Sequence, residues 1–463
     1  LSGQPAARAA IAAGDVLDLE SELAEASTPR RTLARDIGAR FRPVGVEEAD
    51  RESPSFSWAA FFAALGVARP ERFSLAMPAF HARVAELLQT TTPSVWRAYL
   101  RFHTVDGAAP YLGGAYARQH HRFHDAVLRG RLAPLPRWKR VLRAIDTHAG
   151  EAMGELYVAA NFPADAKRRI VDLVEHLRRA LAVRLERLDW MSDATREHAL
   201  RKLAALGVKV GYPDRWRDSS GLVTSPASLY ANILAARAFD RRRRVAQLGQ
   251  PVDRALWPIP PQTVNAGYDP QRNEIVFPAA ILAPPFFDAA ADAALNYGGI
   301  GAVIAHEMTH GFDDQGSRFD ADGRFRSWWL AEDRLRFEAL AERLVERFDG
   351  SDVDGRLTLG ENIADVGGLA IAFDALRDAI AGRDDPMIDG CSQTQRFFLN
   401  WAVIWRQNLT PEEARLRRST DVHAPARIRA NAAPAELGGY AEAFDCRSGD
   451  AMARSADARI RIW

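Results

Sequence analysis

Residues 301–310 read GAVIAHEMTH, a His-Glu-x-x-His pattern that follows a run of apolar residues. His306 and His310 are four residues apart, so on a helix both imidazoles project from one face and can reach the same metal ion. Glu307 between them would lie beside a water molecule at that ion. The spacing therefore predicts a buried helix that carries two metal ligands and a general base.

A second motif, LGENIADVGG, occupies residues 359–368 and places Glu361 and Asp365 four residues apart. A catalytic zinc site commonly has three protein ligands, and two histidines with one glutamate form an established set. Glu361 is thus the expected third ligand, and Asp365 is expected to orient a ligand ring, that of His306. The apolar residues and glycines around the two carboxylates argue against an ordinary solvated helix face.

These motifs lie within a longer pattern that resembles the neprilysin family of zinc metallopeptidases. The matching segments are VNAGY at 264–268, NEIVFPAAIL at 273–282, PPFF at 284–287, NYGGIGAVIAHEMTHGFDDQG at 296–316, LGENIAD at 359–365, FFLNWAVIW at 397–405, and DVHAP at 421–425 with Arg429 after it. The resemblance is dense from about Trp257 to Trp463 and looser but continuous upstream.

The resemblance implies one Zn²⁺ per chain, held by His306, His310 and Glu361, with Glu307 as general acid and base. It also implies that His423 donates a hydrogen bond to the oxyanion and that Arg429 holds a substrate carbonyl group. The implied substrate contacts are Asn265 and Ala266 beside the peptide backbone, and Phe286, Val303, Ile404 and Trp405 with Ile281 around a large apolar side chain. The expected function is a zinc endopeptidase that cuts oligopeptides on the amino side of large hydrophobic residues.

We expect a mainly α fold with a small mixed α/β part. A largely helical domain at residues 1–250 should cover an active-site cavity, and the resemblance implies a thermolysin-like zinc domain at residues 251–463 that faces it across that enclosed cavity. Prolines around Trp257 mark the expected boundary. A helix beginning near Asp165 should bury a stripe of core residues, namely Val171, Val174, Leu177, Leu181, Leu185 and Leu188.

The sequence departs from the family pattern at three places. Gly267 stands where the family usually has an aromatic residue, Ala305 where it usually has glycine, and the sequence around Asn431 is richer in alanine than is usual. The family's opening segment has no counterpart here, so we expect a processed or truncated form with weak activity and a high KM. Because the ligands themselves are kept, two other functions remain open: a catalytically impaired peptide-binding relative, and a zinc hydrolase with a different substrate.

Composition limits the possible partners. The chain has 61 Lys and Arg residues against 60 Asp and Glu residues, so its net charge provides no overall electrostatic attraction for nucleic acid or an anionic membrane. The cluster at 241–244 is interpreted as a solvated helix face. No segment is long and apolar enough to predict a membrane span. We expect a monomer, and the resemblance implies a periplasmic or secreted location.

Two smaller features complete the sequence. QHHRFH at residues 119–124 is interpreted as a group of partly exposed histidines and not as a second metal site. Cys391 and Cys446 are the only cysteines, and whether they pair is open.

Overall fold

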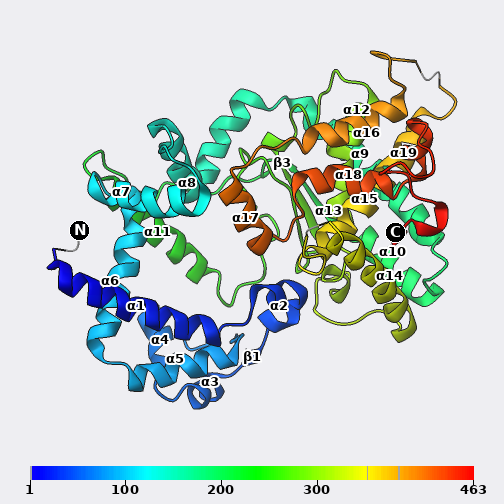
Figure 1. The fold of residues 1–463 in the computed structure, drawn as a ribbon. Coiled ribbons are helices and arrows are strands. Elements are labelled where there is room, and N and C mark those ends of the chain that lie inside the picture. The colour runs from blue at the N-terminus through cyan, green and yellow to red at the C-terminus, as the bar shows by residue number, and fades with distance from the viewer. Residues whose placement is uncertain (1–2, 352, 384–385) are drawn as a thin grey trace. The chain divides into compact units, whose positions relative to one another are not determined.

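The computed structural model describes residues 3–351, 353–383 and 386–463 (Figure 1). The chain divides into two compact units. The first comprises Leu1–Ala144, Asp218–Val252 and Thr410–Leu416, and the second comprises Ile145–Arg217, Asp253–Leu409 and Arg417–Trp463. One break, after Val252, falls at the proline-rich segment. Residues 145–217 belong to the second unit, although the sequence places them in the first domain.

The first unit is built mainly from helices. They are α1 (Ala6–Ala26), α2 (Arg30–Arg35), α3 (Val46–Glu52), α4 (Trp58–Ala64), α5 (Pro78–Thr90), α6 (Pro93–Ala108), α7 (Ala115–His120), the π-helical η3 (His121–Val127) and α11 (Leu229–Ala246). A short antiparallel pair joins β1 (Pro43–Val44) to β2 (Phe73–Ser74). Helix α1 packs against both α5 and α6.

The second unit combines helices with a small sheet. Its helices are α9 (Ala164–Glu186), α10 (Asp193–Ala204), α12 (Ala293–Asn296), the π-helical η5 (Tyr297–Gly301), α13 (Ala302–Thr309), α14 (Ala331–Asp349), α15 (Leu359–Ile380), α16 (Gln393–Ile404), α18 (Ala426–Ala435) and α19 (Gly438–Ala443). Two further helices, α8 (Arg137–Asn161) and α17 (Pro411–Thr420), run across the unit boundaries.

Helix α9 explains why residues 145–217 belong to the second unit. Its apolar stripe is buried against α13 and α15 in one core cluster. The stripe contains Ile170, Val174, Leu177, Leu181 and Leu185. Val171, which we expected in the core, is 40% exposed, and Leu188 lies beyond the helix end and is only partly buried. Ile170 and Val171 both fit the helical period with Val174, so sequence spacing could not separate them.

The sheet of the second unit has the order β3–β5–β4. Strand β3 (Gly207–Gly211) runs parallel to β5 (Glu274–Pro278), and β4 (Gly267–Asp269) pairs with β5 in the antiparallel direction. Strand β3 lies within residues 1–250 and forms by pairing with a strand more than sixty residues later. Strand β4 lies at one edge of this sheet, and Asn265 and Ala266 come directly before it in the sequence.

The predicted fold class is confirmed, since helices dominate and the sheets are small. Within the described residues, no helix has both the length and the apolar character needed to cross a membrane. Cys391 and Cys446 are both free thiols.

Lys202 of α10 is fully buried and holds the segment that follows α13. Its Nζ donates to the carbonyl oxygens of Gly316 and Phe319, each at 2.7 Å. Replacing Lys202 by methionine leaves both buried carbonyls without this donor, so we expect a loss of about 2–4 kcal/mol in unfolding free energy. Thermal and denaturant unfolding measure it.

Arg201→Met is the matched control for Lys202→Met. The Arg201 side chain is half exposed and pairs with Glu197 on the same helix. Its loss should change stability by no more than about 0.5 kcal/mol. Equal effects of the two substitutions would contradict a supporting role for Lys202.

Candidate active site

The two histidines lie at the end of a fully buried helix, as their spacing predicts. All residues of α13 are buried, and His310 is its C-terminal cap. The Nε2 atoms of His306 and His310 are 3.0 Å apart, and their rings meet edge to face. Both imidazoles thus turn the same nitrogen toward one point.

Glu361 reaches that point from the first turn of α15, which packs directly against α13. Its Oε2 lies 3.2 Å from Nε2 of His306 and 3.6 Å from Nε2 of His310. Although this oxygen is buried, it accepts no hydrogen bond of acceptable geometry from the residues that the structure describes. The donor atoms of the three predicted ligands all lie within 4.8 Å of one another.

The close approach of α13 and α15 depends on glycine. A Cβ atom at Gly368 would lie 2.5 Å from the backbone nitrogen of His306 and 2.7 Å from its Cα. One turn earlier on α15, Asp365 faces the same histidine. Ala305 is also fully buried at this contact. Since backbone atoms cannot move aside like a side chain, a residue larger than glycine at position 368 must push the two helices apart.

We therefore expect Gly368→Ala to lower stability by about 1–3 kcal/mol, the usual effect of overpacking a core, and to weaken zinc binding. Thermal unfolding and zinc titration test both effects. Gly350→Ala is the control, because a Cβ there would meet its neighbours at 3.7 Å or more. Unchanged stability and unchanged zinc affinity in Gly368→Ala would show that the helices can separate freely.

Asp365 lies beside His306, where the sequence places it. Its Oδ1 is 2.9 Å from Nδ1 of His306. The same carboxylate accepts two hydrogen bonds from Arg429, both at 2.7 Å. Burial raises the pKa of Asp365, but the charge of Arg429 and its hydrogen bonds outweigh burial and lower that pKa below its ordinary value. Arg429 thus holds an ionised carboxylate against the ligand ring, and its guanidinium also stacks on the Trp405 ring at 3.8 Å.

Electrostatics in this cluster favour an ionised Glu361. Burial raises its pKa, but the charge of His310, with the other imidazoles, holds the pKa of Glu361 well below its ordinary value. Burial lowers the pKa of His310, but the carboxylates of Glu361 and Asp313 raise it well above the usual range. The ionised Glu361 carboxylate and the imidazole nitrogens therefore lie close together in a buried site.

Asp313 completes the support of His310 and was missed by the sequence analysis. Its Oδ2 lies 2.7 Å from Nδ1 of His310, and its Oδ1 accepts from the backbone nitrogens of Gln315 and Gly316. The signal was available, because Asp313 follows His310 by three residues. Each histidine therefore has its own carboxylate at Nδ1, which leaves Nε2 for a ligand.

His423 also reaches the cluster. Its Nε2 is 3.3 Å from Oε2 of Glu361, and its Nδ1 is 2.8 Å from Asp421. The hydrogen bond from His423 lowers the pKa of Asp421. The side chain of His423 is 44% exposed, so it is far more open to solvent than the two helix histidines. Asp421, a residue outside the predicted set, orients it.

The remaining predicted residues belong to the same unit. Glu307 is buried on α13 between the two histidines. Asn265 is exposed and Ala266 is half-buried just before the edge strand β4. The residues predicted to surround an apolar side chain all belong to the core cluster or pack against it: Ile281, Phe286, Val303, Ile404 and Trp405. Their roles toward a substrate remain predictions.

The residues present fit a zinc ion. Two imidazole nitrogens and one carboxylate oxygen are the donor types that zinc takes in catalytic sites. They converge on one point, a carboxylate oxygen lies within 3 Å of Nδ1 of each ring, and the Glu361 oxygen is buried without a hydrogen bond from a described residue. A cation among these donors satisfies all three observations.

Comparisons with known proteins agree with this site. Two models of peptidase family M13 match residues 1–213 and 265–460. Human endothelin-converting enzyme 1 is 31% identical over 97% of this chain and 60% of its own length. A neutral endopeptidase of Lactococcus lactis is 33% identical over 85% of this chain and 62% of its own length. The chain thus spans about 60% of the length of these curated relatives.

Solved structures give the same result. A zinc metalloprotease of Mycobacterium tuberculosis, in complex with an inhibitor, matches the whole chain with a TM-score of 0.95 and 38% identity, and this chain covers 72% of it. PepO from Lactobacillus rhamnosus also matches the whole chain, with a TM-score of 0.92 and 30% identity, and this chain covers 72% of it.

Proposed function

Because this chain belongs to peptidase family M13, we propose that it is a zinc endopeptidase acting on oligopeptides. The observation that carries the proposal is the convergence of His306, His310 and Glu361, with Glu307 between the histidines. Its relatives include proteins named as endopeptidases and a zinc metalloprotease. These support the reaction class as well as the metal.

A zinc ion held by His306, His310 and Glu361 would supply Lewis acidity, which would polarise a peptide carbonyl group and lower the pKa of a water molecule toward neutrality. The chain supplies the proton transfers. The Glu307 carboxylate takes a proton from the attacking water and passes it to the departing amine nitrogen. His423, held at Nδ1 by Asp421, presents Nε2 beside Glu361, where it can donate to the oxygen that gains negative charge.

Substrate positioning is assigned to strand β4 and Arg429. A peptide can add to the free edge of β4, with Asn265 and Ala266 pairing to its backbone, since edge strands offer unpaired N–H and C=O groups. Arg429 uses Nε and Nη2 for Asp365, so Nη1 is the nitrogen left for a substrate carbonyl oxygen. Position 267 has room for a side chain, since a Cβ there would meet only Ile259, at 3.7 Å.

We assign specificity for a large hydrophobic residue after the cleaved bond to the apolar group formed by Ile281, Phe286, Val303, Ile404 and Trp405. Support comes from their common cluster and from Val303, which lies one turn before His306 on α13. Family membership also supports a location outside the cytoplasm. We assign to the unit that contains residues 3–144 the role of covering the active-site cavity.

Zinc content measured beside hydrolysis of a quenched peptide library tests the function. We expect one zinc at this site and cleavage before large apolar residues. Full zinc with no cleavage of any peptide would favour a hydrolase with another substrate. Substoichiometric zinc without turnover would favour an impaired peptide-binding relative.

A further inference from the structure

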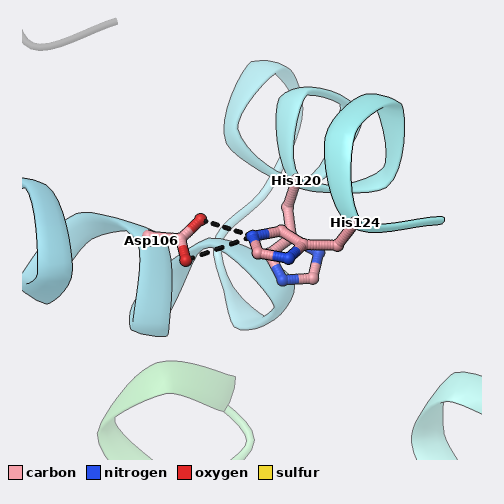
Figure 2. Close-up of side chains that lie close together, drawn as sticks. All are labelled: Asp106, His120 and His124. Atoms are coloured by element: carbon pink, nitrogen blue, oxygen red, sulfur yellow. Dashed lines mark hydrogen bonds and ion pairs between the residues drawn. The ribbon is translucent and has the colours of Figure 1, made fainter. Parts of the chain in front are cut away.

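A second group of side chains that can bind a metal lies in the first unit. It is distant in sequence from α13 and α15, which carry the predicted zinc ligands and are called the zinc helices below. His120 ends α7 and His124 lies one turn later in the π-helical η3. Asp106 belongs to the last turns of α6. Figure 2 shows the Asp106 carboxylate facing the His124 ring, with the His120 ring beside that of His124. The carboxylate therefore comes from a different helix, which spacing along the sequence could not reveal.

The distances between the three side chains suit coordination of a single metal ion. Nε2 of His124 lies 3.0 and 3.2 Å from the two carboxylate oxygens of Asp106. The His120 ring stacks on that of His124 with centroids 4.2 Å apart, and no described residue forms a hydrogen bond with it. One ligand atom from each residue lies within 4.8 Å of the others. Donors around zinc lie about 2 Å from the ion, so small side-chain rotations would close the remaining gap.

The donor set is the same as in the zinc helices. Both groups combine histidines at i and i+4 with one carboxylate from another helix. Two imidazoles and a carboxylate favour zinc and similar divalent transition ions over calcium or magnesium, which prefer oxygen ligands. The π-helical winding at His121–Val127 is a further sign, because π turns are rare and occur often at functional sites.

The burial of this group differs from that of the zinc helices. The side chains of His124 and Asp106 are each about one-third exposed, at 35% and 33%. Asp106 and His120 also line a cavity of about 520 Å³ between α1, α6 and α7, with mostly apolar walls that include Val16, Phe102 and Phe123. An ion here could exchange with solution and would keep a coordination position toward the cavity.

We propose that Asp106, His120 and His124 form a second divalent-metal site, selective for zinc-type ions, that joins α6 to α7 and η3. All its residues belong to the first unit, whereas His306, His310 and Glu361 belong to the second, so the two sites share no ligand. Its ion is held less tightly than the one at His306, His310 and Glu361, because charge attraction is weaker at a site that is more exposed to water.

Zinc titration of the chelator-treated, dialysed full chain tests the proposal. Calorimetry should show two binding events, the tighter at the zinc helices and the weaker at the second site. Substituting His120 and His124 by alanine should remove the weaker event and leave the tighter one. Asp106→Asn, which keeps the shape of the side chain, should weaken the second event by about tenfold or more. Circular dichroism checks that each variant is folded.

His121→Ala is the matched control, because His121 lies in the same run but is held by Asp125 and by the Leu132 carbonyl. It should keep both binding events. The visible absorption of Co²⁺ gives a second readout, with the second set of bands lost only in the His120 and His124 variant. A single event in the native chain, or a second event that survives loss of both histidines, would overturn the proposal.

Discussion

Glu307→Gln is expected to lower kcat for peptide hydrolysis by a factor of about 10² or more while zinc stays bound. Glutamine has nearly the same shape as glutamate but cannot accept the proton of the attacking water. Glu307 is buried between the two histidine ligands and is not one of the three converging donors, so the metal site should persist. Turnover on a quenched peptide and zinc content, measured on the same sample, are the two readouts.

The control for Glu307→Gln makes the same chemical change outside the site. Glu338 on α14 is about half exposed and pairs with Arg334. Glu338→Gln should leave both turnover and zinc content unchanged. Near-normal hydrolysis by zinc-loaded Glu307→Gln would rule out this residue as the general base.

Glu361→Ala is expected to release zinc and abolish hydrolysis. Glu361 is the only one of the three ligands that comes from α15, so its loss leaves two imidazoles with no anionic oxygen. Loss of a partner that merely orients a ligand costs about 10–100-fold in affinity, so loss of the ligand itself should exceed about 100-fold. Competition with a chelator of known affinity measures the change.

Asp374→Ala is the matched control on the same helix. Asp374 is 43% exposed and pairs with Arg184, far from the converging donors. This variant should bind zinc as the native chain does. Full zinc at unchanged affinity in Glu361→Ala would instead show that another residue completes the ligand set.

The zinc cluster could be predicted from sequence because its key relations are local. His306 and His310 share a helix face by spacing alone, and Glu361 and Asp365 do the same on another helix. Only the family resemblance implied that the two helices pack together, since neither motif indicates which segment it contacts. Asp313 is just as local as the histidines, but it was not predicted, because the second motif already offered Asp365 as a carboxylate for a ligand ring.

Other features depend on tertiary contacts that no spacing encodes. Strand β3 forms only because β5 lies beside it, and its GVKVG sequence is too short to show a clear period. Val171 and Ile170 fit the same helical stripe, and packing against α13 and α15 decides between them. Asp106 lies beside the histidines of residues 119–124 but comes from another helix, so spacing along the sequence could not identify it as their neighbour.

The contact between Gly368 and the His306 backbone has a thermodynamic consequence. It fixes the separation of the two ligand-bearing helices through packing, so the site is organised before an ion arrives. In zinc fingers, by contrast, the binding free energy of the metal is also folding free energy. Here chelation should leave a folded but inactive chain, and zinc binding should show little heat-capacity change, since the two ligand-bearing helices are already packed together when the ion enters.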